Sequence, residues 1–334
     1  MSNEIVVISH ANCTDGWGSI NVLQKLFAGE EAMFYSFGHG DTALIESIVA
    51  SCIKKVVIVI DYALPFAVWQ KVVAVAKQVI TLDHHLSAKK EYESQEISIL
   101  NKVEDVTFDL LESEQVITCF DMSKSGAMLT KCFALLFGVS FSYAELDVLN
   151  MIQDMDLFKK ELPHSEHLYA YISNNAMYAD GLYNNAQPLS KEELAKGMSY
   201  FAYICQNLQH VLTEGKARHC LFLEQVETLA GFADETTLSV QINDQLVEHT
   251  GMIINANFLF ASELGSLLAK KTNSFAMIYS IVHGKAKISF RSVKDFDCSV
   301  LAGLLGGGGH KNASACVVDI ETLFDIIEGK TIVK

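Results

Sequence analysis

The chain has 334 residues, half of them apolar, and its 25 Lys and Arg against 40 Asp and Glu give a formal net charge of −15. This length suggests two domains, each with enough apolar residues for its own core. So acidic a surface repels phosphate backbones, which argues against binding along long DNA or RNA, although bound cations can offset the charge inside one cleft.

The first part of the chain alternates short apolar runs with amphipathic stretches. The runs are rich in β-branched or aromatic residues and predict buried strands at residues 4–9, 32–37, 56–60 and 79–82. The stretches between them predict helices at residues 18–27, 42–51 and 65–77. This strand–helix rhythm implies right-handed crossovers and a parallel sheet. A further strand is expected at residues 116–120, followed by a helix at residues 125–137.

From residue 143 to about residue 233 the pattern is helical, most clearly at residues 143–158 and 191–211. The strand rhythm then returns from residue 238, with strands expected at residues 252–255, 274–282 and 286–291 and a helix at residues 262–271. The predicted fold class is therefore α/β. A parallel-sheet domain with a helical extension would span residues 1–212, and a linker helix with a second, smaller α/β domain would span residues 213–334.

Residues that can bind metal ions collect at the ends of three expected strands. In a parallel sheet these ends face the ligand site. The residues are His10, Cys13 and Asp15 after the first strand, Asp61 after the third and Asp83-His84-His85 after the fourth, with Asp154 added from the helical stretch. Mixed carboxylates and imidazoles favour Mn²⁺, with Co²⁺, Mg²⁺, Fe²⁺ or Zn²⁺ as alternatives. One ion needs fewer ligands than this, so we expect two divalent ions.

Each of these residues, taken alone, also fits a structural role. Asp61 could be a helix cap, His10 a satisfied structural histidine, and Asp15-Gly16 a turn before a helix. Asp83-His84-His85 is the stronger signal, because consecutive ionisable residues after a buried strand are costly unless paired. Because metal-binding residues recur at equivalent strand ends, the pattern favours a metal site over separate structural roles.

The sequence resembles the DHH phosphoesterase superfamily over nearly its whole length. The matching motifs are His10 to Asp15, then Asp61, then Asp83-His84-His85, and finally Asp154 in a helix, chosen ahead of its neighbour Asp156. Near the end, Gly306 to His310, preceded by Arg291-Ser292, resembles the glycine-rich motif of the accessory domain called DHHA1. Such glycines let backbone N–H groups approach a phosphate closely.

This resemblance implies a role for each matching residue. His10 and Asp61 would hold one metal ion, and Asp15, Asp61, His84 and Asp154 would hold the second. Asp83 would orient His84, and His85 would face the substrate phosphate as a hydrogen-bond or proton donor. Phosphate or nucleotide would be bound in the second domain by Arg291, Gly307, Gly308, Gly309 and His310.

Cys13 departs from the family pattern, which has an aspartate at this position in most members. A thiolate suits Zn²⁺ or Fe²⁺ better than Mn²⁺. Cys13 therefore either replaces the carboxylate as a ligand to a softer ion, leaves a weak first site, or is a small buried residue.

The resemblance implies a metal-dependent phosphoesterase that works by in-line attack of a hydroxide held between two ions. The family includes RecJ-like exonucleases, nanoRNases, nucleotide-bisphosphate phosphatases and cyclic-dinucleotide phosphodiesterases. The acidic charge favours small substrates, namely short oligonucleotides, nucleotide bisphosphates or cyclic and linear dinucleotides. A pyrophosphatase- or exopolyphosphatase-like hydrolase is one alternative. A non-catalytic nucleotide-binding regulatory module is another, for which Cys13 is the one supporting feature.

The sequence also predicts a cytoplasmic protein. The first residues lack the basic segment and apolar core of a signal peptide, and no run of about eighteen apolar residues occurs. The eight cysteines stand singly, without a Cys-x-x-Cys pair. We therefore expect a reducing compartment and no membrane partner, and the resemblance is compatible with a homodimer.

Overall fold

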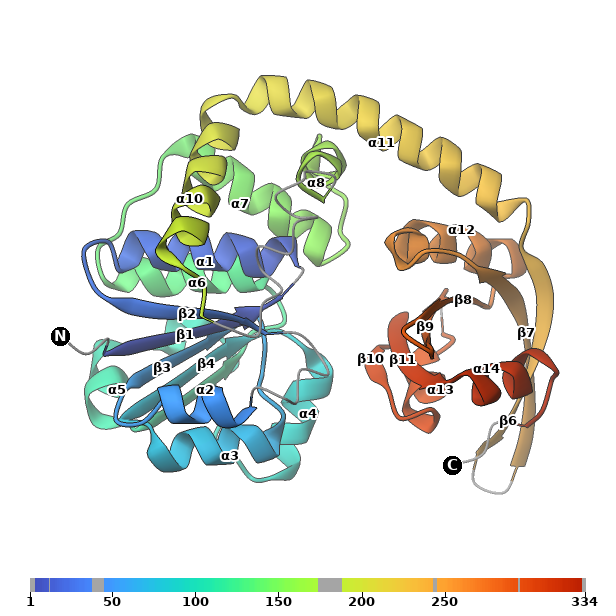
Figure 1. The fold of residues 1–334 in the computed structure, drawn as a ribbon, viewed down its shortest axis with the longest axis horizontal. Helices are drawn as coiled ribbons and strands as arrows, with labels where there is room; N and C mark the ends of the chain where they lie inside the picture. The colour runs from blue at the N-terminus through green and yellow to red at the C-terminus, as the bar shows by residue number, and fades with distance from the viewer. Residues whose placement is uncertain are drawn as a thin grey trace. The chain divides into compact units, whose positions relative to one another are not determined.

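The computed structural model describes residues 4–11, 13–37, 45–173, 188–242, 245–293 and 295–331. The chain divides into two units, Met1–His219 and Cys220–Lys334. The division falls inside helix α11 (Leu208–Ala230), the helix that also contains the boundary expected after residue 212 (Figure 1).

A parallel sheet of five strands forms the centre of the first unit, in the order β2-β1-β3-β4-β5. The strands are β1 (Ile5–His10), β2 (Ala32–Phe37), β3 (Val56–Ile60), β4 (Gln78–Asp83) and β5 (Val116–Phe120). All four strand pairings are parallel. Parallel strands need crossover connections, and the helices between these strands supply them. The predicted parallel sheet is confirmed.

Helices cover both faces of this sheet (Figure 1). One face carries α1 (Thr14–Leu26), α6 (Gly126–Leu136) and α7 (Tyr143–Asp156). The other carries α2 (Ile45–Ser51), α3 (Phe66–Val75) and α4 (Leu86–Ser94). Among the described residues before α11, the unit also contains the α-helices α5 (Phe108–Ser113), α8 (Ser165–Ser173) and α10 (Lys191–Gln206).

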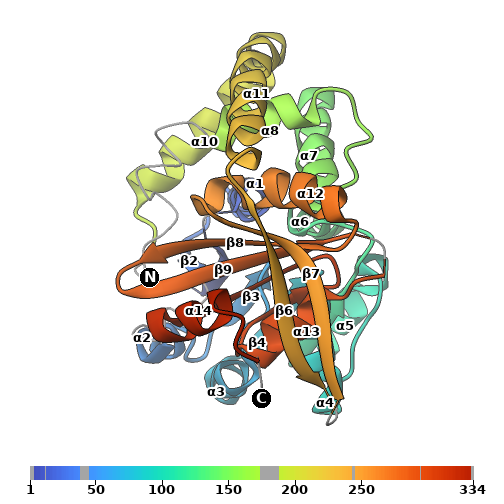
Figure 2. The ribbon, with the colours of Figure 1, turned by 90° about the vertical axis from the view of Figure 1, so that its right-hand side faces the viewer.

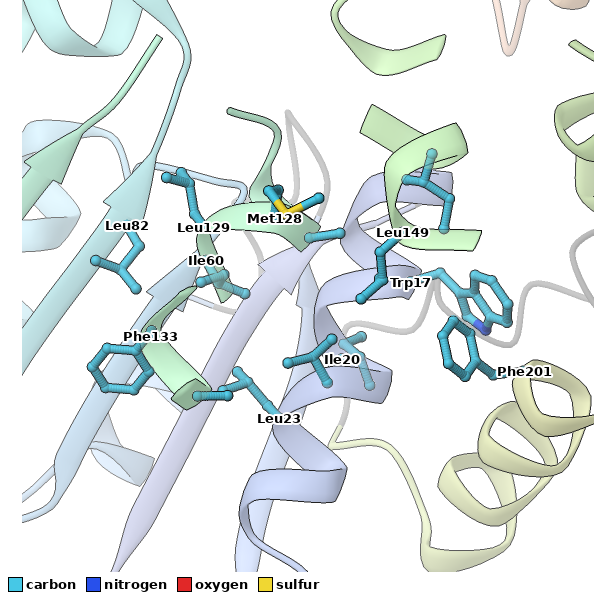
Figure 3. Packing of buried hydrophobic residues seen from close by; sticks show 14 of the residues in the cluster. Trp17, Ile20, Leu23, Ile60, Leu82, Met128, Leu129, Phe133, Leu149 and Phe201 are labelled. Atoms are coloured by element: carbon cyan, nitrogen blue, oxygen red, sulfur yellow. The ribbon is translucent and has the colours of Figure 1, made fainter. Parts of the chain in front are cut away.

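A hydrophobic core lies between the sheet and helices α1, α6 and α7. It fixes the positions of these helices and of the polar residues at their ends. Ile60 of β3 and Leu82 of β4 pack there with Leu129 of α6 and Leu149 of α7 (Figure 3). Each large side chain buried in this way contributes about 1.5–3 kcal/mol relative to exposure. Gly18 lets α1 lie close to α6 and α7, because a Cβ there would be 3.0 Å from the Ala127 Cβ and 3.3 Å from a methyl group of Ile152.

The second unit contains a mixed sheet of six strands, in the order β10-β11-β9-β8-β7-β6. The strands are β6 (Asp234–Ile242), β7 (Gln245–Asn255), β8 (Phe275–Val282), β9 (Lys285–Ser292), β10 (Gly308–His310) and β11 (Ala313–Asp319). The helices are α12 (Ala261–Thr272), α13 (Cys298–Leu304) and α14 (Ile320–Ile327). Among the described strands of this second sheet, only β7 and β8 pair in parallel, and α12 connects them. The predicted α/β class is therefore confirmed for both units.

Two hairpins explain why the second sheet is mostly antiparallel. β6 and β7 run side by side as a long ribbon (Figure 2). β8 and β9 are joined by His283 and Gly284, whose φ angles are 50° and 76°. Two consecutive residues with positive φ form the tight turn that matches the twist of paired strands.

None of the helices in the described part of the chain combines the length and apolar character that a membrane crossing requires. All eight cysteines are free thiols.

Candidate metal centre

The metal-binding side chains expected at the strand ends meet at one edge of the first sheet. β1 ends at His10, Asp61 follows the last residue of β3, and β4 ends at Asp83. Because the three strands are neighbours and parallel, their carboxyl ends lie together. Helix α1 begins directly after Cys13, which brings Asp15 to the same edge.

Asp61 lies at the centre of this group and is only 1% exposed. Its Oδ1 is 3.1 Å from His84 Nε2, and its Oδ2 is 3.8 Å from His10 Nδ1. The Asp61 backbone has a φ of 53°, in the left-handed region, and its N–H donates to the carbonyl of Leu82. This conformation turns the carboxylate so that its two oxygens face different partners.

Besides a group that joins Asp61 with Asp83, His84 and His85, two further groups of potential ligands share this neighbourhood. In the first group, ligand atoms of His10, Cys13 and Asp61 all lie within 4.8 Å of one another. In the second, the same holds for Asp15, His84 and Asp156. His84 Nε2 is 3.5 Å from Asp156 Oδ2 and 3.9 Å from Asp15 Oδ2. Asp61 contacts members of both groups, so its carboxylate can serve both.

Helix α6 fixes the position of Asp15. The backbone N–H groups of Gly126 and Ala127, at the start of that helix, donate to the two carboxylate oxygens. A helix N-terminus carries partial positive charge and therefore favours a carboxylate there. Asp15 is thus held beside the cluster by the backbone of another element.

Two glycines make room for this packing. A Cβ on Gly16 would lie 2.3 Å from the carbonyl oxygen of His10, and a Cβ on Gly126 would lie 2.2 Å from the Cβ of Asp61. Real Cβ atoms do not approach other heavy atoms so closely. Gly16 and Gly126 are therefore required at the starts of α1 and α6, a role that the sequence alone did not reveal.

Close carboxylates make the centre electrostatically unfavourable without a cation. Burial, followed by the charges of Asp15 and Asp156, raises the pKa of Asp61 well above its usual range. Burial and the charge of Asp15 raise the pKa of Asp156 to about 7, although its side chain keeps 21% exposure. Like charges at such distances disfavour ionisation, and bound cations reverse that effect.

The structure also contains an orphaned polar atom that a cation would satisfy. Within the described part of the chain, Asp61 Oδ2 is buried and has no hydrogen-bond partner. A buried carboxylate oxygen without a partner is costly unless paired or bound to metal. The donor set of imidazoles and carboxylates suits divalent first-row ions. The residues therefore fit a metal centre.

Cys13 lies inside the first group. Burial, and then the carboxylates of Asp61, Asp156 and Asp15, raise the pKa of the Cys13 thiol well above its usual range. The thiol is therefore protonated in the metal-free protein, and ligation would require loss of that proton. Its side chain caps no N–H of helix α1, so it has no capping role there.

The carboxylate of Asp83 binds a different imidazole from the one expected. Its Oδ1 accepts a 2.7 Å hydrogen bond from His85 Nδ1, whereas its contact with His84 is with the backbone N–H of that residue. The backbone N–H of Ala63 donates to the other oxygen. The prediction that Asp83 orients the His84 ring is therefore wrong, because the ring that Asp83 holds is that of His85.

Both members of the Asp83–His85 pair are charged. Burial opposes ionisation, but His85 and His84 together lower the pKa of Asp83 to about 2. Burial likewise opposes the charged imidazole, but Asp83 raises the pKa of His85 to about 9. His85 is therefore a cation near neutral pH, with 30% of its side chain exposed at the edge of the centre.

Asp154 is not brought to the centre, which corrects the ligand expected from the helical motif. Its carboxylate accepts hydrogen bonds from the backbone N–H groups of Glu161 and Leu162 and from the hydroxyl of Ser165. Residues two apart on a helix point roughly 200° apart, so only one of Asp154 and Asp156 can face the cluster. Asp156 does, because it continues the row of Leu149 and Ile152 that packs toward α1.

The expected phosphate-binding residues lie in the second unit. Ala313 of β11 pairs with Arg291 of β9 on one side and with His310 of β10 on the other. Directly opposed residues of antiparallel strands present their side chains on the same face, so Arg291 and His310 share one face of the sheet. Arg291 also donates from Nη2 to the hydroxyl of Ser262, at 3.0 Å.

The glycines before His310 have two different roles. A Cβ on Gly307 would lie 2.1 Å from the Ala315 carbonyl oxygen, and one on Gly309, where φ is 139°, would lie 2.6 Å from the Ala313 carbonyl oxygen. These two glycines are needed for the tight pairing of β10 with β11. Gly308 meets nothing within 4 Å, so the backbone is open to an approaching ligand there.

Comparisons with known proteins agree with this architecture. Residues 257–329 match the family model of the DHHA1 domain. The oligoribonuclease NrnB of Bacillus subtilis is 37% identical over 75 residues, which are 22% of this chain and 18% of that protein. This chain therefore covers less than a fifth of that relative's length.

Two solved structures share the fold across almost the whole chain. An exopolyphosphatase-related protein from Bacteroides fragilis covers 98% of this chain and 91% of its own, at 14% identity and a TM-score of 0.52. RecJ from Thermus thermophilus, in complex with Mn²⁺, covers 97% of this chain and 50% of its own, at 14% identity and a TM-score of 0.51.

We predict that Asp156→Asn stabilises the metal-free first unit above neutral pH. With the pKa of Asp156 raised to about 7, the folded chain holds a proton that the unfolded chain releases near pH 4. Stability is therefore lost as the pH rises between these values, and asparagine removes that loss. Each kcal/mol gained should raise the unfolding midpoint by about 2–4 °C.

Tryptophan fluorescence during thermal unfolding in chelator measures this effect, because Trp17 and Trp69 both lie in the first unit. The control is Asp147→Asn, which changes an exposed aspartate of the same helix. Midpoints of Asp156→Asn and the unmodified protein that fall in parallel from pH 5 to pH 8 would contradict the assignment of repulsion to Asp156.

Proposed function

We propose that this chain, whose residues 257–329 match the DHHA1 domain model, is a member of the DHH phosphoesterase superfamily and a metal-dependent hydrolase of small phosphoesters. The observation that carries this proposal is the buried Asp61 carboxylate between two groups of metal-binding side chains. Asp61 belongs to one group and contacts His84 of the other, an arrangement that suits a pair of ions.

His10, Cys13 and Asp61 would hold one divalent ion, and Asp15, Asp61, His84 and Asp156 would hold the other. Such ions supply charge stabilisation to phosphoryl oxygens and lower the pKa of a bound water. The second group offers carboxylates and one imidazole, which favours Mn²⁺, with Mg²⁺ next. The sulfur of Cys13 favours a softer ion in the first group, such as Fe²⁺, Co²⁺ or Zn²⁺.

His85 is the residue best placed to act on the substrate itself. The hydrogen bond from its Nδ1 to Asp83 fixes the ring orientation, so Nε2 is the nitrogen that can donate to a substrate oxygen. In the metal-free chain Asp83 raises the pKa of His85 to about 9, which favours a proton on that nitrogen. His85 can therefore bind a phosphoryl oxygen and supply a proton to the leaving group.

Small nucleotides are the substrates that the chain's charge and second unit favour. A net charge of −15 disfavours long polyanions. Arg291 and His310, on one face of the second sheet, offer donors for a terminal phosphate. The partial likeness to an oligoribonuclease supports short RNA or dinucleotides within this class.

Cys13 is the one residue that favours the alternative of a non-catalytic nucleotide-binding module. Its Sγ nevertheless lies within 4.8 Å of ligand atoms of His10 and Asp61, so the first group keeps three donors. The complete donor sets support the hydrolase over the binding module.

We predict that Asp61→Asn lowers hydrolysis of a dinucleotide by more than about 100-fold, since removing a direct ligand should exceed the loss seen for outer partners. Asparagine tolerates the left-handed conformation that Asp61 adopts, so the sheet should stay folded. Product release in Mn²⁺, together with metal content by elemental analysis, measures the effect.

Asp121→Asn is the matched control. Asp121 follows β5 at the same edge, but its carboxylate accepts hydrogen bonds from the backbone and hydroxyl of Ser123. Wild-type turnover in Asp61→Asn with any phosphoester would overturn the proposed function.

We predict that the protein cleaves dinucleotides with a higher kcat/KM than single strands of about twenty nucleotides, because extra phosphates meet an acidic surface.

His310→Ala should raise KM for the dinucleotide by about 10–100-fold, the scale of one hydrogen bond to a charged group, and leave metal content unchanged.

The matched control is His283→Asn in the β8–β9 turn, where asparagine accepts the positive φ. Processive digestion of long strands would contradict the size preference. An unchanged KM in His310→Ala would remove that residue from substrate binding.

A further inference from the structure

Three histidines form a second cluster in the first unit, and none of them belongs to the metal centre. His164 directly precedes helix α8, His167 lies in the first turn of that helix, and His219 lies on α11. His164 Nδ1 is 3.2 Å from His167 Nδ1, and the ring centroids of His167 and His219 are 5.9 Å apart. His219 Nε2 is also 3.6 Å from Glu166 Oε2.

Helices α8 and α11 are held tightly together at this point. A Cβ on Gly215 would lie 2.0 Å from the carbonyl oxygen of His167, so only glycine permits the contact. One turn away, Arg218 donates to the carbonyl of Tyr171 and its guanidinium lies 4.7 Å from the centroid of that ring. His167 and His219 are therefore presented by backbones that are fixed relative to each other.

The turn that carries His164 is fixed by Asp154. This buried carboxylate accepts hydrogen bonds from Glu161 and Leu162 before the turn and from Ser165 after it. The backbone of His164 has a φ of 72°, a conformation that a non-glycine residue keeps only when its surroundings enforce it. Asp154 thus has an organising role at the histidine cluster.

The separation of the first two nitrogens fits a shared ion. Metal–nitrogen bonds of about 2.0–2.1 Å in a tetrahedral site place two ligand nitrogens about 3.3–3.4 Å apart. The observed 3.2 Å between the two Nδ1 atoms is close to that spacing. Without an ion these two nitrogens form a hydrogen-bonded pair, and His219 Nε2 faces Glu166, which also pairs with Lys160. Binding of a third imidazole therefore requires the His219 side chain to move toward this pair.

We propose that His164, His167 and His219 bind one ion of the Zn²⁺, Ni²⁺ or Cu²⁺ class, separately from the carboxylate-rich metal centre. A donor set dominated by imidazole suits these ions and not Mg²⁺ or Mn²⁺. The ion cross-links the turn before α8 to the middle of α11, segments that are distant in sequence. One chain therefore carries two metal sites of different chemical preference.

The test uses the full chain carrying Asp61→Asn and Asp156→Asn, which weakens the metal centre and leaves the histidines intact. Isothermal titration with Zn²⁺ alone should show a site that is lost, by at least about 10–100-fold in affinity, in both His167→Ala and His219→Gln. The same titration with Mn²⁺ should show no site of this kind.

His210→Ala is the matched control, since His210 lies on α11 and pairs with Glu214 at its exposed surface. It should bind Zn²⁺ like the parent. Tryptophan fluorescence verifies that each variant is folded, and two different substitutions guard against a local folding defect in either one. Equal Zn²⁺ binding by His210→Ala, His167→Ala and His219→Gln would overturn the proposal, and so would Mn²⁺ binding as tight as Zn²⁺ binding.

Discussion

The metal centre depends on one buried carboxylate in an unusual backbone conformation. Asp61 leaves β3 in the left-handed region, and this places its two oxygens toward His84 on one side and His10 on the other. Burial and the neighbouring carboxylates of Asp15 and Asp156 make that arrangement unfavourable by itself. The rest of the fold supplies the free energy that holds these charges together until cations compensate them.

The same contacts that pack the core also position the ligands. Gly126 admits the side chain of Asp61 and, with Ala127, offers its N–H to Asp15. Ala127 also lies against Gly18, where α1 meets α6. A change in helix packing would therefore move Asp15 relative to Asp61, which explains why small residues occupy this interface.

Much of the fold could be predicted, because buried parallel strands are continuous apolar runs between amphipathic stretches. The expected strands at residues 32–37, 56–60 and 116–120 coincide with β2, β3 and β5. The three-residue strand β10 and the longer strand β11 were not predicted as strands, and the single helix expected at residues 191–211 is two helices that meet at Asn207. Such short elements and breaks depend on tertiary packing more than on local pattern.

The candidate ligands at the strand ends could also be predicted from the sequence, but the choice of Asp154 ahead of Asp156 was wrong. Spacing alone cannot say which face of a helix meets a site, although the row of Leu149, Ile152 and Asp156 was an available signal.

The most direct test of a shared Asp61 is the anomalous scattering of Mn²⁺ in crystals of the full chain. The account predicts two peaks about 3.5–4 Å apart, each bonded to an Asp61 oxygen, with Asp156 beside one of them. A single peak, or two peaks of which only one contacts Asp61, would contradict it.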